Sequence, residues 1–205
     1  MANRCYLYTT DHLPGSAEWQ EKKQLRGIAE WPDHIPLSFQ ILLSGNPVAV
    51  PSSIWDSPHP LALAGDAATG LRRLMAYLQL LPAQAEPLVA DAKAFFADAG
   101  TPGTYFVLEC REIYDYNDSD MAVQNGKIIA QIAAIGDDLA KLYLPEPAGA
   151  EPFVRRTLRR LLKLPPPSPL EPYYEIGLGL WSNLLYYDFS PQQSPPPTPM
   201  RAVMP

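Results

Sequence analysis

The sequence predicts a single α+β domain in which several helices pack on a mixed or antiparallel sheet. Strand-like and helix-like segments follow one another irregularly, without the regular alternation that builds a doubly wound sheet. The length of 205 residues suits one large domain, and 47% hydrophobic residues are enough for one core without a disulfide or a structural metal. Of the 24 prolines, many lie in two clusters, which mark where regular structure stops.

The first elements are expected to be extended. Residues 3–9 are rich in β-forming side chains and predict an opening strand. Pro14-Gly15 then indicates a turn within residues 11–15. Residues 27–31 form a short apolar run that Pro32 interrupts.

A helix is expected over residues 35–44, because Pro36 falls in its first turn and Gly45 lies just past its end. Two short strand candidates follow it, at residues 48–50 and 61–64.

The clearest helix begins after Asp66, a good N-cap, and continues until Pro82. Its apolar residues recur at helical spacing: Leu71, Leu74, Met75, Leu78 and Leu81. A second helix is expected over residues 87–99, with Gly100 beyond its end and one apolar face formed by Leu88, Ala92, Phe95 and Phe96.

Residues 104–114 give the best strand in the chain, and their β-branched, aromatic and apolar side chains predict a central place in the sheet. A loop over residues 115–120 leads into a long helix over residues 121–143. Gly126 and Gly136 each cost that helix about 1 kcal/mol relative to alanine, which favours a break near Gly136.

The rest of the chain is dominated by proline and basic residues. Residues 151–163 predict a basic amphipathic helix, interpreted as a solvated face or as a helix that binds a membrane surface, a nucleic acid or a partner. Residues 164–172 form a proline-rich connector, and residues 173–189 predict a last strand or strand-turn-strand. The predicted organisation is one domain over residues 1–190 and a proline-rich flexible tail over residues 191–205.

The charge indicates the kind of partner. The chain has 22 acidic against 16 basic residues, a net charge of −6, which argues against direct nucleic-acid binding and suits a basic partner. We expect a cytoplasmic protein that does not bind membranes, because the chain has neither a signal-peptide pattern nor a long apolar run. Cys5 and Cys110 lie in apolar runs and are expected to be buried free thiols.

No catalytic motif is recognisable: the nucleophile elbow, the phosphate-binding loop and the paired-histidine zinc motif are all missing. The three histidines (His12, His34 and His59) lie in proline-flanked loop segments. Glu109-Cys110-Arg111 with Asp66 upstream resembles a metal-dependent nuclease pattern, but arginine replaces the lysine that could assist a water. We therefore expect no catalytic residue, no metal and no cofactor.

The candidate binding residues lie in one loop: Tyr114, Asp115, Tyr116, Asp118 and Asp120. Tyrosine offers rigid contact area, and carboxylates pair with arginine or lysine on a partner. The same carboxylates allow two other interpretations, an N-cap of the following helix at Asp118 or Asp120 and a calcium loop. The calcium interpretation lacks the glycine turn and the distal glutamate of an EF-hand.

Several stretches carry a family resemblance: Met1-Ala2-Asn3-Arg4-Cys5-Tyr6-Leu7-Tyr8, Ile28-Ala29-Glu30-Trp31 with Ile35-Pro36-Leu37, Leu43-Ser44-Gly45-Asn46-Pro47, and Leu63-Ala64-Gly65-Asp66. Over about the first 80 residues the chain resembles small bacterial cytosolic proteins similar to immunity proteins for polymorphic toxins, including those of type VI secretion nuclease effectors. The resemblance implies a protein that binds a toxin and either covers its active site or disrupts its assembly. It carries over no catalytic residue.

The leading hypothesis is therefore an immunity protein whose partner is its cognate toxin. One alternative is a metal-dependent hydrolase of unrecognised type that uses the histidines or the carboxylates of the 114–120 loop. Another is a cytosolic adaptor that recruits partners through its proline segments or its basic helix. The sequence does not indicate an oligomeric state.

Overall fold

The computed structural model describes residues 3–21, 25–98, 103–114, 120–146 and 168–185 of the chain. Five strands in this part form one sheet in the order β2-β1-β5-β4-β3, and each neighbouring pair is antiparallel. They are β1 (Arg4–Thr10), β2 (Leu25–Pro32), β3 (Val48–Val50), β4 (Ala62–Asp66) and β5 (Tyr105–Glu109). The predicted α+β class is confirmed, and the sheet is antiparallel.

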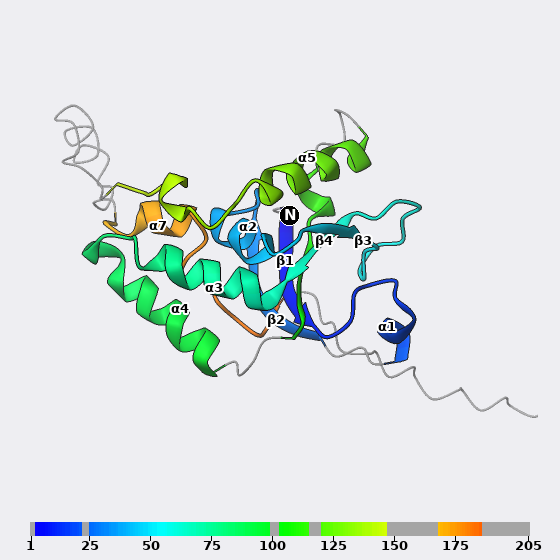
Figure 1. The fold of residues 1–205 in the computed structure, drawn as a ribbon, viewed down its shortest axis with the longest axis horizontal. Coiled ribbons are helices and arrows are strands. Elements are labelled where there is room, and N and C mark those ends of the chain that lie inside the picture. Colours follow the sequence, from blue (N-terminus) through cyan, green and yellow to red (C-terminus); the bar gives the residue numbers. More distant parts are fainter. Residues whose placement is uncertain (1–2, 22–24, 99–102, 115–119, 147–167, 186–205) are drawn as a thin grey trace, which may run out of the picture.

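The helices cover the two faces of the sheet unequally. The α-helices are α1 (Ala17–Glu21), α2 (Leu37–Leu43), α3 (Ala67–Leu78), α4 (Glu86–Asp98), α5 (Met121–Ala133) and α7 (Glu171–Glu175), and the short 3-10 turns are η1 (Ala83–Ala85), η2 (Arg111–Ile113) and η3 (Leu139–Lys141). Figure 1 shows α2, α3, α4 and α7 on one side of β1 and α1 on the other. Among the described residues, no helix has the length and apolar character to cross a membrane.

Two apolar clusters follow from this arrangement, because successive strand side chains point to opposite faces. The larger contains Phe106 and Leu108 of β5 with residues from α2, α3, α4 and α7. The smaller lies on the other face and contains Tyr8, Trp19, Val50, Ala62, Ala64 and Val107. The second face of the sheet is thus covered by α1 and by loops.

The strands expected near residues 3–9, 48–50, 61–64 and 104–114 are present, and residues 27–31, expected only to be apolar, add another. Residues 27–31 lie within β2, an edge strand in which Pro32 is tolerated. Strand β5 occupies the predicted central place but ends at Glu109, where a strand to Tyr114 was expected. Cys110 leaves the extended conformation (φ −132°, ψ 13°), and η2 follows at once.

The two long central helices begin as their sequences indicate. Asp66 caps α3, since its Oδ1 accepts a hydrogen bond of 2.7 Å from the Thr69 backbone N–H. Helix α3 ends at Leu78, one turn earlier than Pro82 suggested. Helix α4 lies where it was expected, within one residue at each end.

The long helix expected over 121–143 is wrong in its second half. Helix α5 ends at Ala133, and η3 follows only after a non-helical stretch, so the break expected near Gly136 is confirmed. Contacts with α3 hold the chain away from a helical path: Arg73 Nε lies 2.9 Å from Asp137 Oδ1, and the Tyr77 hydroxyl donates 2.6 Å to the Tyr143 carbonyl.

The prediction of a strand over 173–189 is also wrong in its described part. Glu171–Glu175 is helical, with proline in its first turn, so the proline-rich connector ends earlier than residue 172. Gly177, at φ +86°, ends this helix in a Schellman motif: its N–H bonds the Tyr174 carbonyl, and the Leu178 N–H bonds the Tyr173 carbonyl.

The segment that follows α7 closes one edge of the sheet. Trp181 forms an isolated antiparallel bridge with Ala29, and its ring lies 5.1 Å from that of Phe96. This segment also supplies hydrogen-bond acceptors to the first turn of α2. The Ser38 N–H donates to the Ile176 carbonyl, and the Ser38 hydroxyl donates to the Gly177 carbonyl. The aromatic pattern of this segment therefore serves packing onto helices and a single bridge.

The remaining expectations concern chain outside the described residues. These are the basic helix at 151–163, the first residues of the connector, the end of the 173–189 segment and the tail at 191–205. Cys5 and Cys110 are both free and buried, as predicted.

Candidate functional site

A buried carboxylate lies beneath the loop that joins β3 to β4. Glu109 is fully buried at the end of β5 and pairs with Tyr6 on β1 and Ala62 on β4. Val107, two residues before it, belongs to the smaller cluster, so Glu109 also faces the side of the sheet that carries α1 and the loops. We call the connecting segment, residues 51–60, the β3–β4 loop.

The β3–β4 loop supplies most of the hydrogen-bond donors around this carboxylate. Ser52 Oγ donates to Glu109 Oε2 at 2.7 Å. Ser53 donates to Glu109 Oε1 through its backbone N–H at 2.7 Å and its hydroxyl at 2.8 Å. Tyr8 donates to Oε1 at a longer 3.4 Å. Both carboxylate oxygens are thus satisfied, as a buried charged group requires.

The hydrogen bonds of Ser52 require a hydrogen-bond acceptor at position 109. Ser52 Oγ accepts hydrogen bonds from the backbone N–H groups of Ile54 at 3.1 Å and Trp55 at 2.9 Å. A hydroxyl has two acceptor lone pairs, so both are in use and its proton is directed at Glu109. The backbone N–H of Ser53 is likewise a donor only. A group with an acceptor on each side, a carboxylate, therefore fits here better than an amide.

Burial is the dominant influence on this carboxylate. It raises the pKa of Glu109 above its ordinary value of 4.5, and the hydrogen bonds from Ser52, Ser53 and Tyr8 lower the pKa without cancelling that effect. Burial also raises the pKa of Tyr8, and the nearby charge of Glu109 raises it further.

This raised pKa gives a pH dependence with a definite sign. The folded protein holds the Glu109 proton more tightly than the unfolded chain, so this group's stabilisation is complete below pH 4.5 and declines as pH rises through the higher folded pKa. Glu109→Gln cannot titrate, so the stability of the natural protein relative to this variant should fall as pH rises above 4.5. Urea denaturation of both proteins over this rise in pH measures it, and a relative stability that rises with pH would contradict it.

A second buried network holds the far end of the β3–β4 loop. The Tyr114 hydroxyl donates to Asn125 Oδ1 at 2.6 Å, and Asn125 Nδ2 donates to the Pro60 carbonyl at 2.8 Å. Cys110 Sγ lies 3.0 Å from the Tyr114 hydroxyl. Burial raises the pKa of Cys110 to about 12 and raises the pKa of Tyr114 as well, so both groups stay neutral. The loop is therefore anchored at both ends by buried side chains.

The structure separates the residues of the predicted 114–120 binding loop. Tyr114, expected to be a contact residue, is only 3% exposed, and its hydroxyl is bonded inside the core. Asp115, Tyr116 and Asp118 lie outside the described residues. Asp120 is exposed and caps α5, accepting a hydrogen bond of 2.8 Å from the Ala122 N–H, so the N-cap interpretation is confirmed for this residue.

The carboxylates of the nuclease-like pattern, which the sequence analysis set aside, do not come together. Asp66 pairs with Tyr105 at one end of the β4–β5 ladder and Glu109 with Ala62 at the other, which separates the two carboxylates by about 13 Å along the strands. Within the described part of the chain, no group of three His, Cys, Asp or Glu side chains is placed to hold a metal ion.

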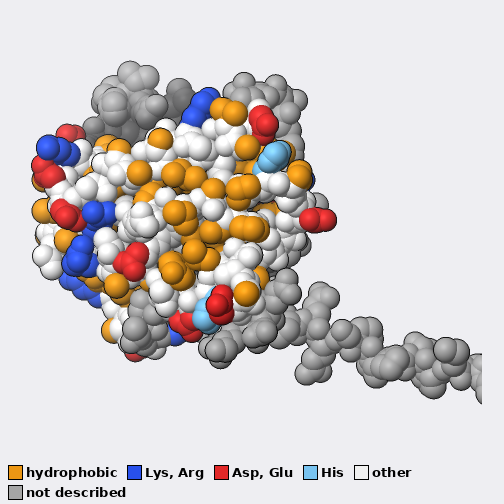
Figure 2. Space-filling model, turned by 45° about the vertical axis from the view of Figure 1, so that its right-hand side comes forward, with side chains coloured by type: hydrophobic (Ala, Val, Ile, Leu, Met, Phe, Trp, Pro, Cys, Tyr) orange, Lys and Arg blue, Asp and Glu red, His pale blue; other side chains and the backbone are white. Residues whose placement is uncertain are grey.

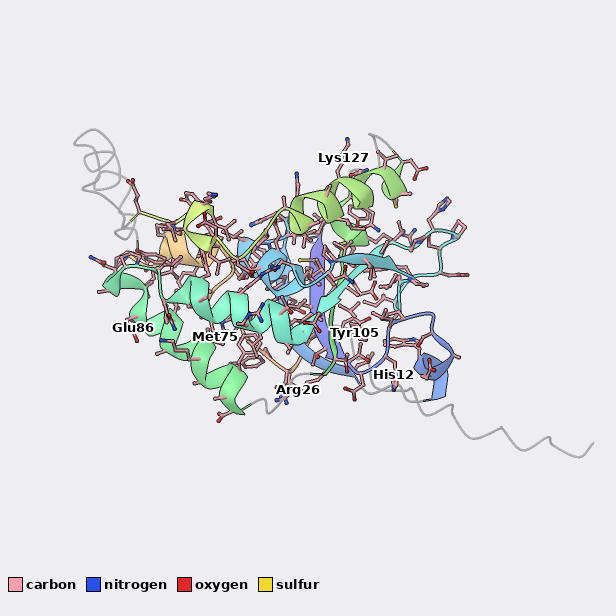
Figure 3. All side chains as sticks on the ribbon, in the orientation of Figure 1. His12, Arg26, Met75, Glu86, Tyr105 and Lys127 are labelled. Carbon is pink, nitrogen blue, oxygen red and sulfur yellow. The ribbon has the colours of Figure 1, made fainter. Side chains whose placement is uncertain are left out.

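The histidines come from three separate places. Figure 3 shows His12 beside α1, far from Lys127 on α5. His34 lies against Trp31 and reaches the Glu175 carbonyl, and His59 is exposed on the β3–β4 loop. They do not converge on a common site.

The exposed side of the β3–β4 loop is apolar and acidic. Val48, Ala49 and Asp56 are exposed, and Ile54 and Trp55 are partly exposed. Figure 2 turns this side of the molecule forward and shows hydrophobic side chains across its centre, with most Lys and Arg side chains of this view at its left and upper margins. The surrounding sequence, residues 27–71, contains no lysine or arginine.

The contact between Glu109 and the β3–β4 loop was not predicted from the sequence, although the sequence contains a signal for it. Glu109 is a carboxylate inside an otherwise apolar strand, and such a residue needs donors from another part of the chain. Ser52-Ser53 could supply them, but only the fold identifies which donors do. The arrangement does not open a reactive group to substrate. It holds a loop rigidly on the sheet.

Comparison with known proteins places most of this domain in one family. The model of a family described as a domain of unknown function (DUF7822) matches residues 11–144, which include the β3–β4 loop and its anchors Glu109 and Asn125. No curated protein and no solved structure matches the chain.

Proposed function

We propose that this chain, which belongs to the DUF7822 family of domains of unknown function, is an immunity protein. It acts in the cytoplasm by binding and neutralising a secreted bacterial toxin, a nuclease effector of a type VI secretion system, through direct protein–protein contact. The observation that carries the proposal is the β3–β4 loop, an apolar and acidic surface held rigid by buried anchors.

A rigid surface suits an inhibitor that must bind tightly. Ordering a loop on binding costs free energy that is subtracted from affinity, and a loop already ordered in the free protein avoids that cost. Here Glu109 and Asn125 order the loop from within the protein. A toxin would therefore meet its binding surface already in place.

The charge supports a nuclease as the toxin. Nucleases that hold phosphate backbones carry excess lysine and arginine, and an acidic inhibitor complements them. The chain has a net charge of −6, and residues 27–71 contain Glu30, Asp33, Asp56 and Asp66 but no cationic side chain other than histidine. Contact at the toxin's basic face would cover its active site or disrupt its assembly.

Co-expression with a toxin tests this function. We expect a toxic nuclease to be encoded by the neighbouring gene, and its growth inhibition to be relieved by this chain through a stoichiometric complex of about nanomolar or tighter affinity. Growth assays and isothermal titration against a catalytically inactive toxin measure both effects. A neighbouring toxin that is neither bound nor neutralised would exclude the proposal.

A double variant separates this binding role from catalysis. His12→Ala with His34→Ala removes two histidines that lie outside the β3–β4 loop. If the protein acts by binding the toxin through the β3–β4 loop, the double variant should still protect cells fully against the toxin. Loss of protection with an intact complex would favour an enzyme.

A further inference from the structure

We infer that the toxin-binding surface is the exposed side of the β3–β4 loop together with β3, and that its occupant is a cationic surface of the toxin. This surface consists of Val48, Ile54, Trp55, Asp56 and Pro58, and we call it the loop face. The inference rests on the proposed function and replaces the 114–120 loop as the main contact.

The loop face has the composition of a protein-binding surface. Trp55 is partly exposed beside exposed Asp56, and its ring centroid lies 6.4 Å from that of Tyr6 beneath it. Tryptophan residues held in this way often dominate binding energy. Val48 is 37% exposed on an outer strand and extends the apolar area next to the loop. Figure 2 shows hydrophobic side chains across the centre of the view that turns this side of the molecule forward.

The loop face is ordered before any partner arrives. Ser52 and Ser53 hold its first half to Glu109, and the Ser52 hydroxyl also accepts the N–H groups of Ile54 and Trp55. Asn125 holds the last residue of the β3–β4 loop through the Pro60 carbonyl. The residues that would touch a partner therefore lie between two fixed points, which lowers the entropy cost of binding.

The loop face itself carries an exposed carboxylate and no lysine or arginine, which favours a cationic partner. No lysine or arginine occurs from residue 27 to residue 71, while Asp56 is exposed at the centre and Asp120 is exposed at the start of α5. Helix α5 also carries Asn125, which binds the Pro60 carbonyl, so its start lies beside the loop. Arginine on the toxin could pair with these carboxylates and stack on the Trp55 indole.

Strand addition is disfavoured as the binding mode. Strand β3 is the outer strand on its side of the described sheet, and its three residues are flanked by Pro47 and Pro51. Proline lacks the N–H that a ladder needs and commonly blunts sheet edges. The partner is therefore expected to contact side chains of the loop face.

Two variants and two matched controls test the surface. Trp55→Ala removes the aromatic anchor, and Asp56→Arg reverses an exposed charge. Tyr143→Ala and Asp91→Arg make comparable changes at exposed positions away from the loop, beside the C-terminal end of α3 and on α4. Figure 1 shows α4 on the opposite side of the sheet from the β3–β4 loop.

The probe is the inactive toxin encoded by the neighbouring gene, measured by biolayer interferometry at two salt concentrations. We expect Trp55→Ala to weaken binding by about tenfold or more, chiefly through faster dissociation. Asp56→Arg should slow association and reduce its salt dependence. Both controls should stay within about twofold of the natural protein, which corresponds to about 0.4 kcal/mol.

The outcomes separate this inference from the proposed function. If the natural protein binds the toxin and Asp56→Arg binds equally well at the same rate, the loop face is not the contact and the function stands. If the natural protein does not bind, the function itself falls. Asp56 is exposed, so its variant remains informative even if Trp55→Ala fails to fold in a thermal melt.

Discussion

Glu109→Ala should lower the free energy of unfolding by about 3 kcal/mol, because it removes the acceptor for several buried donors. Ser52 Oγ, Ser53 N and Ser53 Oγ would each lose their bond to the carboxylate, and Tyr8 would lose a longer one. Ser52 Oγ already accepts two N–H groups, and the acceptor of its own proton is Glu109. Removing the charge relieves its own burial cost, but it leaves these donors unpaired.

Urea denaturation at pH 7 measures this loss, and Glu109→Gln is the matched control. The amide keeps the size and one acceptor oxygen, but it presents an N–H₂ group to a donor, so we expect an intermediate loss of about 1 kcal/mol. Toxin affinity should fall in the same order, since the loop face depends on this anchor. An alanine variant as stable as the natural protein would show that the loop is held by other contacts.

Gly70→Ala should also lower the free energy of unfolding by about 3 kcal/mol, for a steric reason. Gly70 lies in α3 where this helix crosses α2, and a methyl group there would overlap the carbonyl of Leu42. That atom belongs to the backbone of a buried helix and cannot move aside alone. The two helices would have to separate, which opens the larger core cluster around Leu42 and Leu74.

Gly126→Ala is the matched control, because it makes the same substitution in the interior of another helix. A methyl group at Gly126 meets nothing within 4 Å, so only helix propensity applies and stability should rise by about 1 kcal/mol. Thermal and urea denaturation of both variants measure the contrast. Changes of the same sign at the two positions would refute the proposed close approach of α2 and α3.

Elements specified by local signals were predicted well. The Asp66 side chain caps α3, as expected from its type and position. Helices α3 and α4 show the spacing of apolar residues that places one face in a core. Strand β5 is central, as its apolar composition indicated, because apolar clusters cover both of its faces.

Elements that depend on distant contacts were predicted poorly. The segment after residue 170 has a strand-like composition but packs as a short helix and one bridge against α2, α4 and β2. The break after helix α5 was expected from Gly136, but the contacts of the chain beyond it with Arg73 and Tyr77 of α3 were not. Composition cannot report either set of contacts.

The sequence alone determined the fold class, the positions of most helices and strands, two N-caps and the acidic character of the chain, because each depends on neighbouring residues or on sums over residues. The tertiary structure decided which loop is presented. Tyr114 is of a residue type common in binding surfaces, yet in the fold its side chain is buried and its hydroxyl contacts Asn125 and Cys110. Ser52 and Glu109, 57 residues apart, become partners only when the sheet brings them together, since a buried carboxylate takes the donors that the fold places beside it.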